Sequence, residues 1–196
     1  MDIIFATKNK GKLIEVKAIL SLYNILGMEE AGIHIEVEEN GETFEENAMK
    51  KAVEIMAECG KIVLSDDSGI EIDYFDKAPG VHSARYLGHD MPYIEKNAII
   101  LDKLKDVPME KRTARYVAVI AAALPDGRTF SARGVMEGYI GYEPKGGNGF
   151  GYDPIFYLYE YGESVAQIPK ELKNKISHRG KALEAMKEIL AVKLNQ

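Results

Sequence analysis

Two neighbouring strand-like segments in the middle of the chain most constrain the fold. Residues 115–124 form a largely apolar run, the turn-forming residues Pro125, Asp126 and Gly127 follow, and a second strand-like run covers residues 129–136. Strand, tight turn and strand in succession predict an antiparallel hairpin. Before it, short apolar strands alternate with helical patterns, so the chain as a whole is predicted to be a mixed α/β protein, not a doubly wound parallel sheet.

Local patterns predict the other elements. Thr43 followed by Glu46 is a capping-box pattern that begins a helix reaching about Glu58. Pro92 fits the first turn of a helix reaching about Lys105. The remaining predicted elements are buried strands at 3–6 and 62–64, alternating strands at 33–37 and 70–73, a helix at 9–21, a glycine-dense loop at 146–154, and a helix at 178–194 with Ser177 as N-cap.

Composition limits the class of protein. The 196 residues suffice for one domain, and a net charge of -6 argues against a nucleic-acid binder while allowing a small anion held by a local basic cluster. The single cysteine, Cys59, excludes an internal disulfide and is predicted to be a buried small hydrophobe. Asp2 stands where a signal peptide would carry basic residues, and the longest apolar run is too short for a membrane span. We therefore expect a cytoplasmic protein with neither a membrane nor a nucleic acid as partner.

The first candidate site follows the first strand and opens the first helix, in the sequence Thr7-Lys8-Asn9-Lys10-Gly11-Lys12. Unpaired backbone N–H groups at a helix N-terminus favour an anion, and the lysines add positive charge. The spacing is not that of a Walker A loop. The alternatives are a phosphate-binding turn and a solvated basic turn.

The second candidate is acidic, Ser65-Asp66-Asp67-Ser68-Gly69, predicted to lie where a strand ends. Adjacent carboxylates point in different directions, so one can face a site while the other caps a backbone turn. A carboxylate that faces a phosphate site requires a cation between them, and Mg²⁺ prefers oxygen ligands. The alternative is a purely structural Asx-turn. An acidic run at residues 36–42 either complements the dipole of the helix that follows or supplies a second metal ligand.

Two further candidates lie near the C-terminal end. In the glycine-dense loop, Phe150 offers a flat face for a base and Asp153 an acceptor; alternatively the loop is a hydrophobic plug. Lys173 and the run Ser177-His178-Arg179-Gly180 place basic donors at a helix start, against the helix dipole. The alternative there is a capped helix with exposed basic residues. His34, His82 and His89 have no ligand spacing and are expected to be structural or exposed.

In this order the motifs resemble the inosine triphosphate pyrophosphatase family. The resemblance covers nearly the whole chain and rests on 7–12, 41–48, 65–69, 78–80 with 83–86, 147–154, and 177–180. One departure is Lys8, where the family commonly has glycine, which puts the approach of that loop to the phosphates in doubt. The resemblance implies a single catalytic domain over residues 1–196, with an elongated mixed sheet and two lobes flanking a substrate cleft. It also implies a homodimer.

The resemblance further implies Mg²⁺-dependent hydrolysis of the triphosphates of inosine, deoxyinosine and xanthosine to the monophosphate and pyrophosphate. By motif, Asp67 is the general base and a metal ligand, and Glu38 is its best-placed acidic partner, with Glu39 as the alternative. Lys51 approaches the phosphates. The substrate-binding residues carried over by motif are Thr7, Lys8, Asn9, Lys10, Gly11, Lys12, Ser68, Phe150, Gly151, Tyr152, Asp153, Lys173, His178 and Arg179.

This chemistry suits the residues. The base donors would match the 6-keto oxygen of hypoxanthine or xanthine, whereas adenine presents an amino donor there. Two other functions stay open on sequence: a pyrophosphatase selecting modified pyrimidines, and a nucleotide-sensing module without catalysis.

Overall fold

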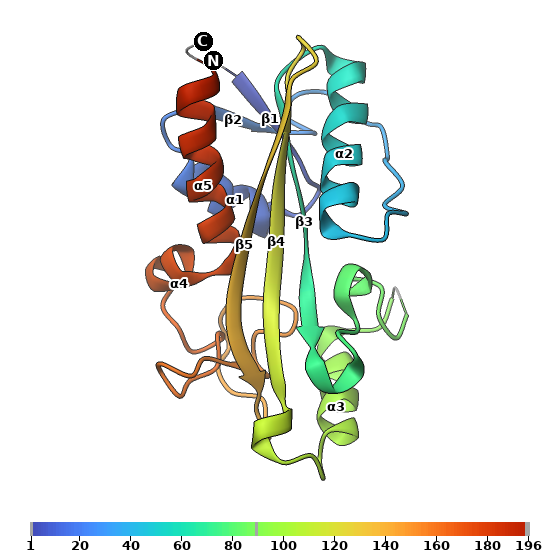
Figure 1. The fold of residues 1–196 in the computed structure, drawn as a ribbon, viewed down its shortest axis with the longest axis vertical. Coiled ribbons are helices and arrows are strands. Elements are labelled where there is room, and N and C mark those ends of the chain that lie inside the picture. Colours follow the sequence, from blue (N-terminus) through green and yellow to red (C-terminus); the bar gives the residue numbers. More distant parts are fainter. Residues whose placement is uncertain (1, 89, 195–196) are drawn as a thin grey trace. The chain divides into compact units, whose positions relative to one another are not determined.

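A computed structural model describes residues 2–88 and 90–194, which form two compact units. The first comprises the described parts of Met1–Asp67, Ala118–Gly134 and His178–Gln196, and the second comprises Ser68–Val117 and Val135–Ser177. One six-stranded sheet has the order β2-β1-β3-β4-β5-β6, accompanied by helices (Figure 1). The predicted mixed α/β class is confirmed. No described helix is long and apolar enough to cross a membrane.

The first unit begins with parallel strand pairing. β1 pairs in parallel with both β2 and β3, as expected for strands joined by crossover helices. Its elements are β1 (Asp2–Ala6), α1 (Lys10–Ile19), β2 (Asn24–Gly27), α2 (Phe44–Cys59), the first part of β3 (Val63–Ile72), and α5 (His178–Lys193). Asn9 caps α1, and Thr43 caps α2 by accepting from the Glu46 N–H at 3.1 Å, which confirms the predicted capping.

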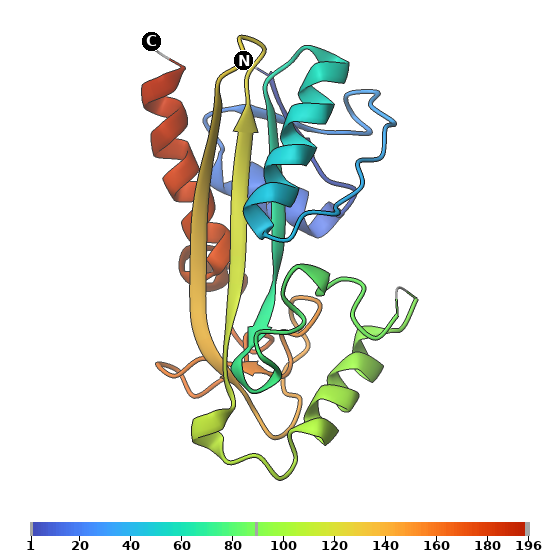
Figure 2. The same cartoon turned by 45° about the vertical axis from the view of Figure 1, so that its right-hand side comes forward.

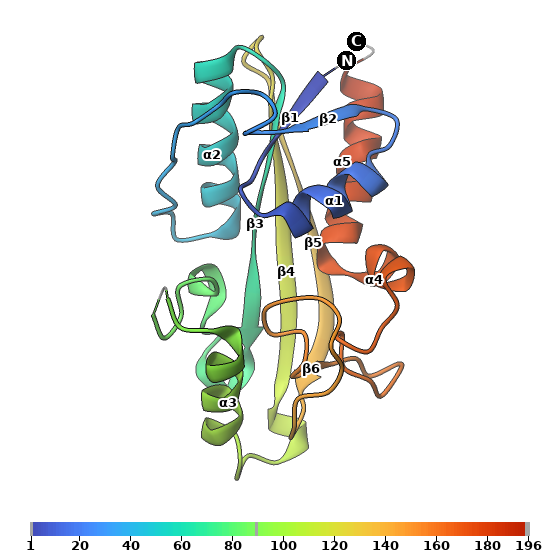
Figure 3. The ribbon, with the colours of Figure 1, turned by 180° about the vertical axis from the view of Figure 1, so that it is seen from behind.

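The core of the first unit lies under α1 and α5, seen from behind in Figure 3. Val16 and Leu20 of α1 and Leu183, Met186 and Leu190 of α5 pack there against alternate residues of the sheet. At Gly134 of β5, helix α5 meets the strand directly, because an added Cβ would lie 2.1 Å from the His178 carbonyl oxygen. Only glycine permits this approach.

The predicted hairpin is present, and its two strands extend further from the turn than expected. β4 spans Thr113–Ala123 and β5 spans Thr129–Ile140, and the two are neighbours in the sheet. The Leu124 N–H donates to the Arg128 carbonyl at 2.9 Å and closes the turn. Figure 2 follows the two strands side by side along their length.

The second unit has its own core, built from alternate residues of β3, β4 and β5 together with α3 (Tyr93–Lys103), β6 (Phe156–Tyr157) and the segment between β5 and α4 (Lys170–Ile176). The short helical turns η1 (Asp73–Phe75), η2 (Gly80–His82) and η3 (Met109–Lys111) complete it. Arg112 is fully buried in this unit, and its guanidinium donates to the carbonyls of Leu104, Ile140 and Gly141.

Several local predictions were wrong. Residues 33–37 are not a strand despite their alternation, and the second strand lies at Asn24–Gly27. Ser65–Gly69 does not end a strand but lies within β3. Helix α4 was missed; it ends with its C-cap Ser177, the residue that directly precedes α5. Cys59, at the end of α2, is half-buried, not buried.

Two of the three histidines expected to be structural or exposed, His34 and His82, are exposed. His89 lies outside the described residues.

Candidate active site

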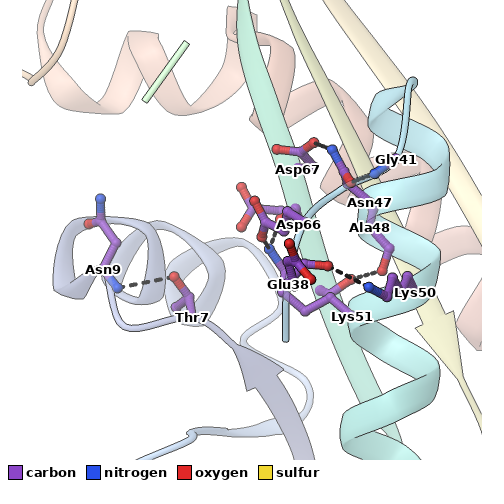
Figure 4. A network of polar contacts seen from close by, with 12 residues as sticks. Thr7, Asn9, Glu38, Gly41, Asn47, Ala48, Lys50, Lys51, Asp66 and Asp67 are labelled. Carbon is purple, nitrogen blue, oxygen red and sulfur yellow. Dashed lines mark hydrogen bonds and ion pairs between the residues drawn. The ribbon is translucent and has the colours of Figure 1, made fainter. Parts of the chain in front are cut away.

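The turn before α1 is organised around its helix N-terminus. The Asn9 N–H donates to Thr7 Oγ1 at 3.1 Å (Figure 4). Asn9 Oδ1 accepts from the Lys12 N–H at 3.1 Å. No acidic residue lies in the first turn of the helix. The local electrostatics therefore suit an anion, as the sequence predicts.

The cations of this turn have different surroundings. Lys8 is exposed and paired with Glu36, and Lys10 is exposed at the first position of α1. Lys12 is largely buried, and its Nζ lies 2.8 Å from Asp66 Oδ2. A cavity of about 690 Å³ lies beside the turn, and its lining includes Thr7, Lys8, Asn9 and Lys10.

Asp66 and Asp67 are adjacent residues inside β3, so their side chains leave opposite faces of the strand. Asp66 meets Lys12 of α1 and Arg179 of α5, whereas Asp67 meets Asn47 of α2. The two carboxylates therefore have separate environments, as expected from their adjacency, and both lie within a strand and not in a turn.

Asp66 belongs to a buried, charge-paired cluster. Its Oδ2 lies 3.4 Å from Arg179 Nε, and Arg179 Nη1 lies 2.7 Å from Glu15 Oε2. Burial alone would raise the pKa of Asp66, but the positive charges of Lys12, Arg179 and Lys51 hold it well below its usual range. Burial lowers the pKa of Lys12, with Asp66 opposing that change. Asp66 is thus a permanent anion that holds cations in place.

Asp67 is tuned in the opposite direction. It is 7% exposed, and its Oδ2 accepts from Asn47 Nδ2 at 2.9 Å. Burial raises its pKa to about 6, with the negative charges of Glu39 and Asp66 adding to the rise and the Asn47 bond and Lys51 opposing it. A carboxyl that titrates near neutrality has the property required of a general base.

Asn47 and Glu15 were not singled out on sequence. Asn47 is 1% exposed, and it accepts from the Gly41 N–H at 2.8 Å while donating to Asp67. The available signal was an asparagine on the apolar face of a helix, beside Phe44 and Ala48, where it is unfavourable without a buried partner. Glu15 carried no such signal, because a glutamate in a surface helix is ordinary.

Lys51 lies one turn further along α2 than Asn47. Its Nζ donates to the Asp66 carbonyl at 2.7 Å and pairs with the Glu39 carboxylate. Glu38 is exposed, and its backbone carbonyl accepts from Lys50 Nζ at 2.7 Å (Figure 4). The negative charge of Glu39, the alternative named on sequence, contributes to the raised pKa of Asp67.

The donor set fits Mg²⁺ only if substrate supplies further oxygens. Among residues 2–88 and 90–194 no three His, Cys, Asp or Glu residues form a group able to hold a metal. Mg²⁺ is usually bound through one or two carboxylates together with substrate phosphates and water. Asp67 and Glu39 supply hard oxygen donors of that kind, and their mutual repulsion is what a cation would relieve.

The second unit organises the glycine-dense loop. Phe150 is 41% exposed, and Lys173 Nζ lies 4.8 Å from the centre of its ring. Asp153 is buried, and its Oδ2 accepts from the Phe150 N–H at 2.9 Å and from Lys173 Nζ at 2.8 Å. Tyr152 is 2% exposed and T-shaped against Tyr93. Tyr152 is thus the hydrophobic plug, whereas the Phe150 ring is partly exposed.

The predicted site residues accordingly fall into two groups. In the first unit, Thr7 and Asn9 lie in the turn before Lys12, and Lys12 and Arg179 meet at Asp66, whereas Asp67 lies on the other face of β3 beside Asn47. Lys8, Lys10, Gly11 and Glu38 are exposed or half-buried, and His178 is buried at the start of α5. The second unit brings together Phe150, Gly151, Tyr152, Asp153 and Lys173, with Ser68 half-buried on β3.

Comparison with known proteins gives one consistent answer. The Ham1 family matches residues 3–189. A protein of Exiguobacterium sibiricum named dITP/XTP pyrophosphatase is 46% identical over 100% of both chains, and one of Bacillus subtilis with the same name is 43% identical over 96% of each. The solved Staphylococcus aureus Ham1 protein superposes with a TM-score of 0.90 at 37% identity, covering 98% of this chain and all of the other. The resemblance predicted from the motifs is confirmed, and the chain belongs to the Ham1 family.

Proposed function

We propose that the protein hydrolyses the triphosphates of inosine, deoxyinosine and xanthosine to the monophosphate and pyrophosphate. The observation that carries this proposal is Asp67, a buried carboxyl held by Asn47, whose pKa is raised to about 6 and which lies within reach of the charges of Glu39 and Lys51. The names of the relatives support the substrate class.

The residues of the first unit bind the triphosphate. The backbone N–H groups at the start of α1, with Thr7 and Asn9, donate to phosphate oxygens, and Lys12 and Lys51 supply positive charge. Asp67 and Glu39 hold Mg²⁺, which neutralises phosphate charge and orients the oxygens when it is bound.

Asp67 is the general base. It accepts a proton from the attacking water, whose oxygen forms a bond to the α-phosphorus while the bond to the leaving pyrophosphate breaks. Asn47 holds one oxygen of the Asp67 carboxylate, which fixes the orientation of the base. The chain needs no covalent nucleophile for this single displacement.

The base binds at the glycine-dense loop. The partly exposed Phe150 ring offers a stacking face, and we assign the 6-keto oxygen to Lys173, the one of the predicted cationic donors that lies beside this ring. A 6-amino group in the same position would meet donors and leave them unpaired, which disfavours adenine by about 1–3 kcal/mol for each donor affected.

The decisive experiment is a panel of nucleoside triphosphates with Mg²⁺, scored separately for pyrophosphate and orthophosphate. Inosine and xanthosine triphosphates should release pyrophosphate faster than adenosine, guanosine and modified pyrimidine triphosphates. Orthophosphate as the only inorganic product would exclude attack at the α-phosphorus. Tight nucleotide binding with no product would favour a sensing module instead.

The metal assignment has a matched test. Glu39→Gln should raise the Mg²⁺ concentration needed for half-maximal rate by about tenfold, since it removes one of two charged ligands. Glu38→Gln, at the next residue, is the control and should leave that concentration unchanged. The reverse result would transfer the ligand to Glu38, and no change in either variant would remove both.

We further propose that the enzyme is a cytoplasmic homodimer. Apart from its second subunit, it binds the nucleotide substrate and neither a nucleic acid nor a membrane. The resemblance supports the dimer, and the net charge of -6 agrees with the absence of a nucleic-acid partner. Light scattering during gel filtration tests the dimer, and a single-subunit mass at micromolar concentration would refute it.

A further inference from the structure

Helix α3 carries a buried asparagine that the proposed chemistry does not use. Asn97 is 5% exposed, and its Nδ2 donates to the Gly151 carbonyl at 3.2 Å. Gly151 stands in the turn between Phe150 and Asp153 and has a φ of 70°. Asn97 therefore holds the backbone carbonyl of the residue that directly follows Phe150.

The same helix also forms a hydrogen bond to the segment at residues 83–84. The neighbouring Lys96 is 1% exposed, and its Nζ donates to the Ala84 carbonyl at 2.9 Å. Tyr152 OH donates to the Ser83 carbonyl at 2.7 Å. Lys96 of α3 and Tyr152 of the glycine-dense loop thus both donate to backbone carbonyls of residues 83–84, and all of these residues belong to the second unit.

The other half of the Asn97 amide indicates why an asparagine is present. Its Oδ1 is buried and has no hydrogen-bond partner among the described residues. An unpaired buried acceptor opposes folding, so a leucine of similar volume would suit the fold better. A residue that breaks a local rule in this way is expected where function requires it.

We propose that Asn97 is a positioning residue of the nucleotide-binding loop, acting through its hydrogen bond to Gly151 to set where Phe150 meets the base. This inference rests on the proposed function for the identity of the ligand. Asn97 touches neither the phosphates nor the attacking water, so its loss weakens binding of the nucleotide without slowing the bond-breaking step.

Two variants separate positioning from packing. Asn97→Leu keeps the approximate volume and removes both the donor and the unpaired oxygen, whereas Asn97→Asp keeps the shape and places an acceptor against the Gly151 carbonyl. Ala98→Asp adds the same charge at an exposed position of α3 and is the matched control.

We expect KM for inosine triphosphate to rise about tenfold in Asn97→Leu and more in Asn97→Asp, with kcat within about twofold of wild type. The dissociation constant of inosine monophosphate, measured by calorimetry, should rise by the same factor. The melting temperature of Asn97→Leu should equal or exceed that of the wild type, and Ala98→Asp should match the wild type in both KM and affinity. A lowered melting temperature of Asn97→Leu with unchanged KM and affinity would show a structural role only and would overturn the proposal.

Amide hydrogen exchange gives a readout that needs no activity. In the ligand-free protein, exchange over residues 148–154 should accelerate in both Asn97 variants and not in Ala98→Asp. Faster exchange together with no pyrophosphate release by the wild type from any triphosphate would refute the proposed function and leave the loop contact intact. Unchanged exchange would refute the positioning role even if the enzyme acts as proposed.

Discussion

Asp66 and Asp67 are neighbours in the chain, yet they are opposites in chemistry. Asp66 lies among Lys12, Arg179 and Lys51, and its pKa is held well below its usual range in spite of burial. Asp67 lies beside Asn47 with Glu39 and Asp66 nearby, and its pKa is raised to about 6. One strand thus presents a structural anion on one face and a proton acceptor on the other. The difference shows that neighbouring charges, and not burial alone, decide which of two buried carboxyls can exchange a proton near neutral pH.

The comparison is tested most severely at Asp67. Asp67→Asn should lower kcat by about 10²–10⁴-fold, because the general base is lost while the shape of the side chain is kept. The same variant should be more stable than wild type above pH 6. In the wild type the folded state holds its proton more tightly than the unfolded chain, so stability falls as pH rises from about 4 to about 6 and stays constant above that.

The rise in the pKa of Asp67 from 3.8 to about 6 corresponds to about 3 kcal/mol of unfolding free energy. Urea titrations of wild type and Asp67→Asn without Mg²⁺, at pH 4 and pH 8, measure it. The two proteins should differ little at pH 4, and a less stable variant at pH 8 would contradict the environment assigned to Asp67.

Asp66 should behave in the opposite way. Asp66→Asn removes the anion shared by Lys12 and Arg179 and should reduce the unfolding free energy by about 3–5 kcal/mol at pH 7, since buried cations lose their partner. The folded pKa of Asp66 is lowered, so its contribution is present above the unfolded value of about 4 and is lost as pH falls through the lower folded value.

The difference in unfolding free energy between wild type and Asp66→Asn should therefore shrink below pH 4, as followed by chemical denaturation. A difference that stays constant down to strongly acidic pH would show that packing, and not charge, accounts for the effect. Glu184→Gln, which changes an exposed carboxylate on α5, is the control and should alter stability little.

A smaller effect is expected at Asn47. Asn47→Ala removes the hydrogen bond that stabilises ionised Asp67, so the acid limb of the pH profile of kcat/KM should move about one unit to higher pH. The profile is measured with inosine triphosphate at saturating Mg²⁺. A shift to lower pH would mean that Asn47 does not stabilise the charged form.

The smallest effect should come from the cap of α2. Thr43→Ala removes the acceptor for the Glu46 N–H and should reduce the unfolding free energy by about 1 kcal/mol. Because α2 carries both Asn47, which binds Asp67, and Lys51, which binds the Asp66 carbonyl, the variant weakens both contacts to a similar extent. The pH profile of kcat/KM should therefore not shift. A shifted profile would show that the position of α2, and not Asn47 itself, sets the pKa of Asp67.

Much of the fold could be predicted because its signals are local. The hairpin turn at 125–127, the Thr43 cap and the apolar face of α5 depend on neighbours in the sequence, and all three are confirmed. The predicted strand at 33–37 had the right alternation, but a strand needs a partner strand, and a single segment does not reveal whether one exists. β2 has only four residues, too few for a clear period.

The site was less accessible to such reasoning. Five small or acidic residues at 65–69 are typical of a loop, yet they lie within β3, where Lys12, Asn47 and Arg179 from three different helices bind the two aspartates. The resemblance supplied Asp67 as the base, whereas its separation from Asp66 depends on which helix covers which face of the strand. Glu15 and Asn47 belong to the site only because the fold brings them to Arg179 and Asp67.

The close approach at Gly134 has a consequence for the position of Arg179 at the start of α5. Since α5 rests on the backbone of β5 there, the depth of the helix is set by main-chain atoms and not by the sizes of interchangeable apolar side chains. A methyl group at position 134 would push the start of α5 away from β5 and would move the Arg179 guanidinium with it.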